Sequence, residues 1–171
     1  MDYILRFIKK YIPEKFFNKL APTYHYLLAF LAALVYRFPS RKIFVIGVTG
    51  TKGKTTVIEL LGAILEEAGH KVAFSNTLRF KIKNESQRNI FKMTMPGRFF
   101  LQSFLRKAVR KKCNYAVLEM TSEGAKQFRH RFISLNALIF TNLAPEHIES
   151  HGSYEKYREA KLSIAHGLKQ S

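Results

Sequence analysis

Apolar residues follow two alternating patterns along most of the chain. Short apolar runs bounded by glycine or polar residues predict buried strands at 43–48, 71–75, 115–119 and 137–141. Apolar residues three and four positions apart predict helices at 54–68, 98–112 and 153–168, and alternation predicts a hairpin over 79–93. Strands that alternate with helices are typical of an α/β fold, with a mostly parallel sheet flanked by helices.

The first 40 residues are basic and aromatic and lack this alternation. Apolar spacing predicts one helix around 4–11, and a second apolar stretch covers 24–36 before Pro39 ends the segment. That stretch is shorter than the ~20 apolar residues of a spanning helix. It fits a helix packed against the domain or a partner domain, and it also fits a helix on a membrane surface. We therefore expect a helical extension over 1–40 and the domain over 41–171.

Composition narrows the function classes. The 29 Lys and Arg against 12 Asp and Glu give a net charge of +17, which attracts nucleic acid, acidic lipid or nucleotide phosphates. Asp2 is the only aspartate, so a magnesium-binding carboxylate in the domain has to be a glutamate. The single cysteine, Cys113, excludes an internal disulfide framework and a four-cysteine zinc site. We expect a cytoplasmic protein, with membrane association through the helical extension 1–40 as the alternative.

A loop rich in glycine and threonine joins the strand 43–48 to the helix 54–68. Its sequence is Gly50-Thr51-Lys52-Gly53-Lys54-Thr55-Thr56. Glycines let backbone amides turn toward phosphate oxygens, and the helix N-terminus adds partial positive charge. We expect these seven residues to bind a nucleotide, with Lys54 on the β- and γ-phosphates and the Thr55 hydroxyl on magnesium. A turn without a ligand is the alternative, since the strict pattern G-x-x-x-x-G-K-[ST] would need a glycine at Val48.

The same loop, written V-T-G-T-K-G-K-T-T from Val48, resembles that of the Mur ligases. These are ATP-dependent amide-forming enzymes of peptidoglycan precursor synthesis, and the folylpolyglutamate synthetases are their relatives. Both usually have asparagine where this chain has Lys52. The substitution adds charge near the phosphates and leaves the loop geometry plausible.

Glu119 lies at the carboxyl end of a predicted strand, where open α/β sheets bind ligands. Taken alone, it also fits a carboxylate that caps a neighbouring helix. The segment E-M-T-S-E-G that it begins resembles the E-V-S-S-x-G stretch of the Mur ligases, above all of the enzyme adding the third stem-peptide residue. The resemblance implies magnesium binding by Glu119, substrate contacts from Thr121 and Ser122, and an anchor for a substrate anion at Arg129.

The segment 140–152, F-T-N-L-A-P-E-H-I-E-S-H-G, resembles the F-T-N-L-x-x-D-H-L-D-x-H-G stretch of the same family. Glu146 and Glu149 stand where aspartates are usual. The resemblance implies that His147 is a catalytic residue and a second magnesium ligand. His147 and His151, four apart, also have a spacing found at zinc sites, but no further Cys or His ligand lies close by in the sequence.

Two further segments complete the resemblance. Tyr157 to Lys161, Y-R-E-A-K, is similar to Y-x-x-A-K, in which carbon dioxide carbamylates the lysine. This implies a catalytic Lys161 whose added negative charge positions magnesium, whereas composition alone makes it a solvated helix residue. Thr94, in K-M-T-M-P-G, occupies the position of the family's T-T-P segment and is implied to touch the substrate, with a plain turn as the alternative.

The resemblance covers about residues 43–165 and implies an incomplete Mur ligase central domain that uses ATP and Mg²⁺. In the implied reaction, ATP phosphorylates a substrate carboxylate, and an amino group attacks the acyl phosphate to form an amide. The implied substrates are a UDP-N-acetylmuramoyl peptide, which we expect to be a dipeptide, and an amino acid, which we expect to be a diamino acid. Set against the family, we expect the basic segment 1–40 to stand in place of the N-terminal domain, and we expect the C-terminal domain to be missing. We therefore expect a truncated or split product that binds nucleotide weakly and does not ligate alone.

Two other functions stay open. Folylpolyglutamate synthesis is the alternative among ligases, and the matches at 122–129 and 147–152 favour the Mur ligases over it. The other class is a basic nucleotide-binding module that docks on nucleic acid or acidic membrane. The net charge of +17 and the aromatic residues of the segment 1–40 support this class. Of these two partners, we do not expect nucleic acid.

Overall fold

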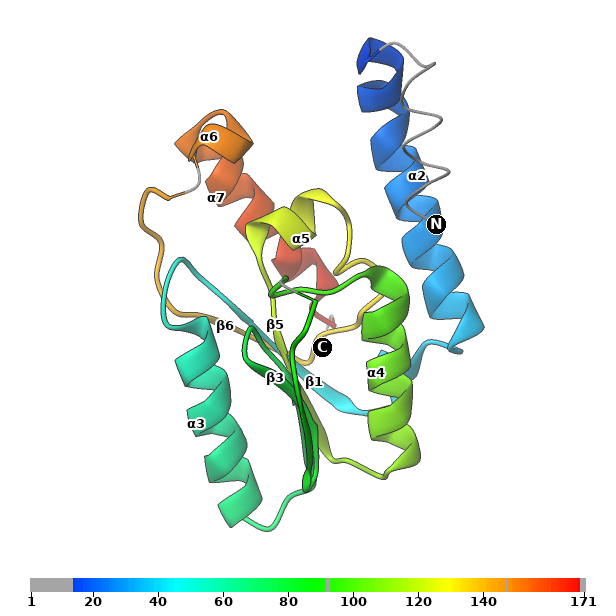
Figure 1. The fold of residues 1–171 in the computed structure, drawn as a ribbon, viewed down its shortest axis with the longest axis vertical. Coiled ribbons are helices and arrows are strands. Elements are labelled where there is room, and N and C mark those ends of the chain that lie inside the picture. Colours follow the sequence, from blue (N-terminus) through cyan, green and yellow to red (C-terminus); the bar gives the residue numbers. More distant parts are fainter. Residues whose placement is uncertain (1–13, 92, 147, 170–171) are drawn as a thin grey trace.

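A six-stranded sheet lies at the centre of the computed structural model, which describes residues 14–91, 93–146 and 148–169 (Figure 1). The strand order is β4-β3-β2-β5-β1-β6. Strands β2, β5, β1 and β6 are parallel, whereas β3 and β4 form an antiparallel edge. The bounds are β1 Phe44–Thr49, β2 Val72–Ser75, β3 Arg79–Ile82, β4 Glu85–Arg88, β5 Tyr115–Glu119 and β6 Ala137–Phe140. The predicted mostly parallel sheet is confirmed.

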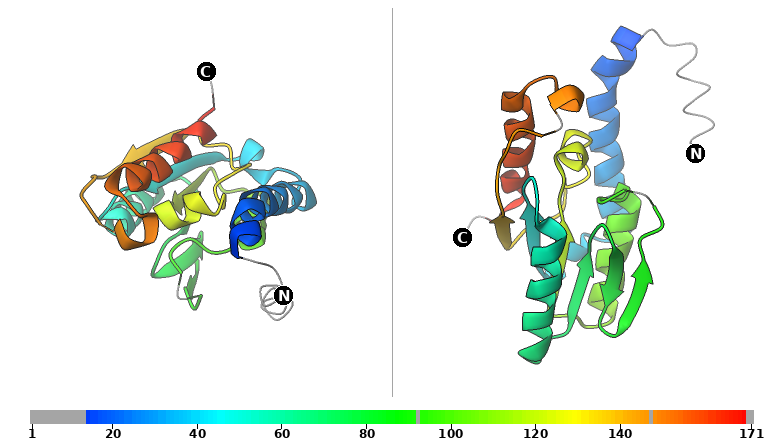
Figure 2. Two further views of the ribbon diagram at one scale, coloured as in Figure 1. Left: turned by 90° about the horizontal axis from the view of Figure 1, so that it is seen from above. Right: turned by 60° about the vertical axis from the view of Figure 1, so that its left-hand side comes forward.

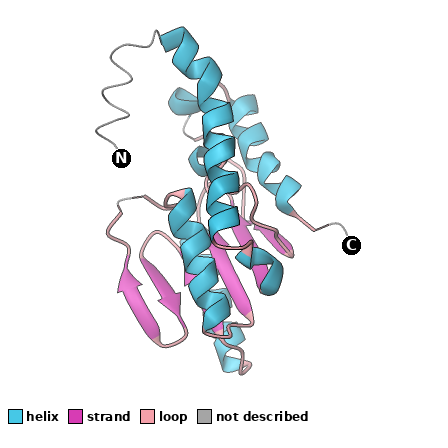
Figure 3. Ribbon diagram, turned by 90° about the vertical axis from the view of Figure 1, so that its right-hand side faces the viewer, coloured by secondary structure: helices cyan, strands magenta, loops and turns pink. Residues whose placement is uncertain are grey.

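Helices cover both faces of the sheet and its carboxyl end. The α-helices are α2 Glu14–Val35, α3 Lys54–Glu67, α4 Arg98–Arg110, α5 Ser122–Lys126, α6 Ile148–His151 and α7 Tyr154–Leu162, and the 3₁₀ helices are η1 Pro39–Lys42 and η2 Ser163–Gly167. Helix α3 lies on one face and α4 on the other, and α2 contacts α4 and extends beyond the carboxyl end of the sheet (Figures 2 and 3). Helices α5, α6 and α7 gather at the end where the β1–α3 loop lies (Figure 1).

Alternate residues of each central strand enter different cores. Val45 of β1 and Ala116 of β5 belong to the core beneath α4, while Ile46, Val48 and Val117 belong to the core beneath α3. This follows from the two-residue period of a strand whose two faces are both covered. Burial on both faces fixes the register of the parallel strands, so their carboxyl ends lie together at one end of the sheet.

Helix α2 is longer than the apolar stretch that predicted it. It begins at Glu14 and continues through Pro22, whereas the prediction started after that proline. Its Tyr26 and Phe30 rings meet the Phe132 ring at centroid distances of 5.0 and 5.3 Å, and the helix also contacts α4. The helix predicted around 4–11 lies outside the described residues. In the part of the chain that the structure describes, no helix has the length and apolarity needed to cross a membrane.

Two predicted elements differ in detail from the expectation. The helix predicted over 153–168 is present as α7 followed directly by the 3₁₀ helix η2. The helical stretch ends where the backbone pairs with Leu135: Gly167 O accepts from Leu135 N at 2.6 Å, and Lys169 N donates to Leu135 O at 2.8 Å. The hairpin predicted over 79–93 ends at Arg88, and its turn includes Lys83 with a φ of 54°. The short helices α5 and α6 were not predicted from the sequence.

Candidate functional site

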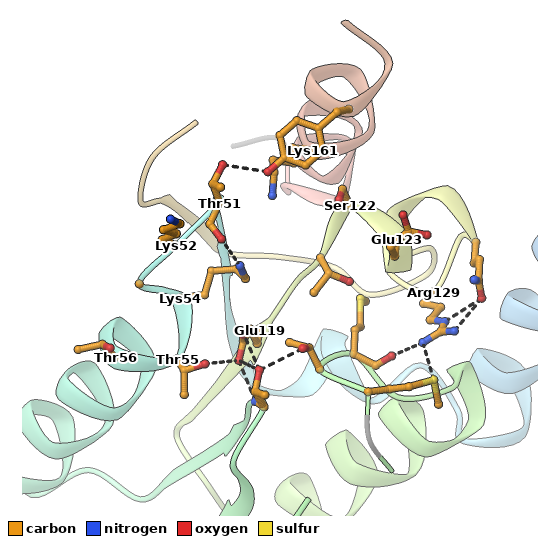
Figure 4. Close-up of a pocket in the computed structure, with 18 residues that line it drawn as sticks. Thr51, Lys52, Lys54, Thr55, Thr56, Glu119, Ser122, Glu123, Arg129 and Lys161 are labelled. Atoms are coloured by element: carbon orange, nitrogen blue, oxygen red, sulfur yellow. Dashed lines mark hydrogen bonds between the residues drawn. The ribbon is translucent and has the colours of Figure 1, made fainter. Parts of the chain in front are cut away.

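A cavity of about 740 Å³ opens at the carboxyl ends of the parallel strands (Figure 4). Its lining comes from segments far apart in the sequence: 51–56, Thr77, 93–95, Glu119, 121–123, Gln127, Arg129, Tyr157 and Lys161. The structure therefore brings most of the predicted site residues together, including Thr94, Thr121 and Ser122. His147, the remaining predicted ligand, lies outside the described residues.

The loop between β1 and α3 is held in shape by the segment after β6. Gly50 has a φ of +139°, and a Cβ there would lie 2.0 Å from Thr141 Oγ1, so only glycine fits. Asn142 Oδ1 accepts from the amides of Thr51 and Lys52 at 3.1 and 3.0 Å, and its Nδ2 donates to Lys52 O at 3.1 Å. Asn142 lies in the quoted F-T-N-L stretch, yet the sequence suggested no role for it.

Two lysines converge on this loop. Lys54 Nζ donates to Gly50 O at 3.0 Å and to Thr51 O at 2.9 Å, while Lys161 Nζ donates to the same Gly50 oxygen at 2.7 Å. Lys161 is only 2% exposed, which rules out a solvated helix residue. Burial, together with the charge of Lys54, lowers the pKa of Lys161 to about 8, and burial also lowers the pKa of Lys54. Two ammonium groups this close favour an anion in the cavity.

Glu119 is the centre of a hydroxyl network (Figure 4). Its Oε2 accepts from Thr55 Oγ1 at 3.0 Å, from Thr77 N at 2.9 Å and from Thr77 Oγ1 at 3.1 Å. Thr94 Oγ1 lies 3.1 Å from Thr77 Oγ1, so the Thr94 hydroxyl belongs to the same network at the cavity wall. Sequence reasoning missed Thr77, although its place just after the second parallel strand was a signal. The Thr55 hydroxyl and the Glu119 carboxylate are hard oxygen donors, which suit Mg²⁺.

The wall formed by α5 and the following turn carries the predicted substrate contacts. Thr121 caps α5, because its Oγ1 accepts from Gly124 N at 3.0 Å. Ser122 is buried beside it. Arg129 is held by Gln127 Oε1, at 2.7 Å from Nη2, and by a bond from Nη1 to the Met95 carbonyl. Burial lowers the pKa of the Arg129 guanidinium, and its side chain keeps a fixed position at the cavity.

Tyr157 links helix α7 to the phosphate loop. Its hydroxyl lies 2.9 Å from Thr51 Oγ1, its ring is fully buried, and Lys161 Nζ lies 4.6 Å from the ring centroid. The residue belongs to the quoted Y-x-x-A-K stretch, but the sequence suggested no role for its side chain. The contact fixes the helix that presents Lys161.

The described residues test the zinc alternative only in part. His151 Nε2 lies 3.2 Å from Glu123 Oε1. Across 14–91, 93–146 and 148–169, no three His, Cys, Asp or Glu side chains gather as a metal site. A zinc pairing of His147 with His151 stays a prediction, since His147 lies outside the described residues.

Comparisons with known proteins agree with these motifs. A model of the Mur ligase middle domain matches residues 48–171. A UDP-N-acetylmuramoyl-L-alanyl-D-glutamate–2,6-diaminopimelate ligase from Syntrophomonas wolfei is 40% identical over 143 residues, which are 84% of this chain and 29% of that protein. A UDP-N-acetylmuramyl-tripeptide synthetase from Borrelia garinii is 38% identical over 77% of this chain and 26% of its own length. The chain thus spans less than a third of these curated relatives.

Solved structures show the same fold. A UDP-N-acetylmuramoyl-L-alanyl-D-glutamate–2,6-diaminopimelate ligase superposes with a TM-score of 0.66 and 28% identity over 74% of this chain and 26% of that one. FolC from E. coli superposes with a TM-score of 0.59 over 78% of this chain and 38% of its own. At 21% identity, the second likeness concerns the fold alone.

Proposed function

This chain belongs to the Mur ligase family through its middle domain, and from that premise we propose that it supplies the nucleotide and magnesium site of an ATP-dependent ligase. The proposed ligase adds an amino acid to a UDP-N-acetylmuramoyl peptide, in keeping with the names of its relatives. The central observation is that Lys54, Lys161 and the Thr55–Glu119 pair line one cavity.

Each side of the cavity suits one part of this task. When bound, ATP would phosphorylate a substrate carboxylate and so activate it for amide formation. The 50–56 loop offers amides at the first turn of α3, which lack intrahelical acceptors and suit phosphate oxygens. Lys54 would neutralise phosphate charge, and Thr55 and Glu119 would hold Mg²⁺. His147 joins this set on the strength of the family resemblance.

The opposite wall suits the peptide substrate. Thr94, Thr121 and Ser122 offer hydroxyl groups, and Arg129 offers a buried guanidinium, all lining the same cavity as the phosphate loop. A guanidinium recognises a carboxylate through paired hydrogen bonds. We assign Arg129 to an anionic group of the muramoyl peptide, which would place the acceptor carboxylate within the shared cavity.

We also propose that Lys161 is carbamylated. The neutral amine attacks carbon dioxide, a nitrogen–carbon bond forms, and a proton leaves to solvent. Burial favours this reaction because it lowers the pKa of Lys161 to about 8, which increases the neutral fraction near neutral pH. The carbamate would also replace the repulsion between two ammonium groups at Gly50 O by an attraction.

Carbon-13 NMR tests the carbamate in protein equilibrated with labelled bicarbonate. We expect a carbamate carbonyl signal in the wild type that disappears in Lys161→Met and persists in Lys156→Met, which alters an exposed lysine of the same helix. A signal unaffected by Lys161→Met would refute the assignment.

The nucleotide site itself is tested by calorimetry with ATP and Mg²⁺. Lys54→Ala should weaken binding at least about tenfold, because it removes a charge-assisted contact to phosphate. The matched control is Lys71→Ala. Lys71 is an exposed lysine just before β2, so it lies at the amino-terminal end of the parallel strands, away from the cavity. Equal affinities for wild type and Lys54→Ala would contradict the proposal.

The folylpolyglutamate alternative has only the shared fold in its favour, and the cytoplasmic location stays a prediction.

A further inference from the structure

Helix α2 presents an apolar stripe directed away from the domain. The stripe consists of Leu20, Tyr24, Leu27, Leu31 and Leu34, which are 56, 38, 58, 47 and 51% exposed. Their spacing of four and three places them on one helix face. On the opposite face, the small residues 29 and 33 are buried, which lets the helix lie close to the domain.

This stripe is unusual for a solvent-facing surface. No charged residue occurs between Leu20 and Tyr36, although the outer face of a globular protein's helix normally carries polar and charged residues. A contiguous apolar patch of this kind indicates an interaction surface. Figures 2 and 3 show α2 on the outside of the molecule, on the side remote from α3.

A basic pocket adjoins the C-terminal end of the stripe. This pocket of about 370 Å³ lies between α2 and α4 and is lined by Val35, Tyr36, Arg37, Ser103, Arg106, Lys107 and Arg110. Four of these seven side chains are cationic and none is acidic. The pocket therefore attracts an anionic group at the place where the apolar stripe ends.

The turn that ends α2 places one of these cations. Arg37 has a φ of 59°, a left-handed conformation that is unfavourable for a residue with a side chain. Arg37 N donates to Leu34 O at 2.9 Å and Phe38 N donates to Ala33 O at 2.8 Å, which closes the helix as glycine usually does. An arginine thus occupies a glycine-like position and lines the pocket.

We propose that the stripe and the basic pocket form a docking surface for an anionic phospholipid membrane. The stripe would enter the boundary between headgroups and acyl chains, and the pocket would hold a lipid phosphate. Interfacial helices bind in this way, with apolar burial and cationic attraction acting together. This function is separate from nucleotide binding and extends beyond the proposed ligase.

Charge decides between the candidate occupants. A second copy of a chain with a net charge of +17 would be repelled, whereas an anionic membrane is attracted by the same field. Nucleic acid would be attracted too, but a stripe of leucines provides no contact that phosphates or base edges use. The described helices do not reach the length and apolarity of a membrane span, so α2 would lie along the surface.

Vesicle flotation of the full chain tests the proposal. The probes are vesicles of phosphatidylcholine alone and vesicles of equimolar phosphatidylcholine and phosphatidylglycerol. We expect binding to the anionic vesicles only. The stripe variant Leu27→Ser/Leu31→Ser should bind at least about tenfold more weakly, and the pocket variant Arg106→Ala/Arg110→Ala about thirtyfold more weakly.

Matched variants separate this surface from general charge and hydrophobicity. Leu60→Ser/Ile64→Ser changes two apolar residues of α3 that are 59 and 64% exposed, and Lys71→Ala/Arg88→Ala removes two exposed cations elsewhere. Both controls should bind like the wild type, and an unchanged circular dichroism spectrum verifies folding of each variant.

Three results would overturn the proposal. The wild type could fail to bind anionic vesicles, or the stripe and pocket variants could bind them as tightly as the wild type does. The control variants could also lose as much affinity for the vesicles as the stripe and pocket variants. A wild-type dimer in light scattering that Leu27→Ser/Leu31→Ser dissociates, without vesicle binding, would assign the stripe to a second copy. Lys54→Ala should leave vesicle binding unchanged, so failure here and failure of the nucleotide site remain distinguishable.

Discussion

Two cation-rich regions of this molecule differ in what surrounds their charge. At the cavity beside β1, the ammonium groups of Lys54 and Lys161 are bonded to loop carbonyls, and Glu119 lines the same wall with three donors on its carboxylate. At the end of α2, Arg37, Arg106, Lys107 and Arg110 adjoin exposed apolar side chains, and no carboxylate lines their pocket.

The difference shows that net charge selects only the sign of a ligand. The surroundings select its kind: fixed amides, a carboxylate and hydroxyls suit a phosphate with its metal ion, whereas an exposed apolar stripe suits a lipid surface. Both regions contribute to the net charge of +17, which alone could not tell them apart.

The largest expected effect comes from the loop that shapes the cavity. Gly50→Ala should destabilise the protein by about 3–5 kcal/mol and abolish nucleotide binding, because its Cβ would lie 2.0 Å from Thr141 Oγ1 and 3.0 Å from the Asn142 backbone. Gly69→Ala is the matched control, since Gly69 also has a positive φ, +82°, but no atom within 4 Å of such a Cβ. It should cost about 1 kcal/mol. Urea unfolding measures both, and equal losses would show that the loop is not sterically fixed.

The next effect is a pH dependence that arises from Lys161. Its folded-state pKa, about 8, lies below the ordinary value of 10.5, so between these values the unfolded chain binds more protons than the folded one. The free energy of unfolding should therefore rise by about 2 kcal/mol from about pH 8 to about pH 10 in buffer free of carbon dioxide.

Urea unfolding of Lys161→Met at the same pH values provides the control. The difference between wild type and variant isolates this lysine from other titrating groups, including Lys54. A rise of the same size in both proteins would mean that Lys161 keeps an ordinary pKa.

A smaller effect concerns the metal. Glu119→Gln keeps an oxygen that accepts hydrogen bonds from Thr55 and Thr77 but removes the charge that Mg²⁺ requires. The factor by which Mg²⁺ raises the affinity for ATP should be about ten times smaller in this variant than in the wild type. Glu123→Gln, which changes the other glutamate of the same cavity, should keep the full enhancement. An unchanged enhancement in Glu119→Gln would remove Glu119 from the metal site.

The smallest effect is expected at the apolar stripe. Leu31→Ser should change the free energy of unfolding by less than about 0.5 kcal/mol, because Leu31 is 47% exposed. Leu105→Ala in the buried core of α4 should cost about 2–5 kcal/mol. Thermal or urea unfolding compares them, and a large loss for Leu31→Ser would assign the stripe to folding instead of binding.

Much of the fold followed from local patterns. The apolar runs predicted the four parallel strands, and the glycine-rich loop predicted the turn into α3, because burial on both faces and phosphate-loop geometry leave strong local signals. The helical tail predicted over 153–168 is confirmed as α7 and η2, but its backbone pairing with Leu135 was not predicted, because Leu135 lies far away in the sequence. Sequence periodicity does not report such long-range pairing.

The candidate site was only partly accessible from the sequence. The residue types of Lys54 and Glu119 suggested their chemistry, whereas Thr77, Asn142 and Tyr157 act through contacts made by folding. Asn142 and Tyr157 stood in recognised segments, yet no role of their side chains could be predicted there. Thr77 and Asn142 follow parallel strands, so both lie at the edge where ligands bind. That topological rule, applied to every strand, would have found them.

A crystal structure of the full chain with Mg²⁺ and a non-hydrolysable ATP analogue would show whether the cavity beside β1 is the nucleotide site. We expect phosphates on the 50–56 loop, Mg²⁺ on Thr55 and Glu119, and Lys54 Nζ moved from the Gly50 and Thr51 carbonyls to the phosphates. Phosphates found instead among Arg37, Arg106 and Arg110, with Lys54 still bonded to its loop, would refute that assignment.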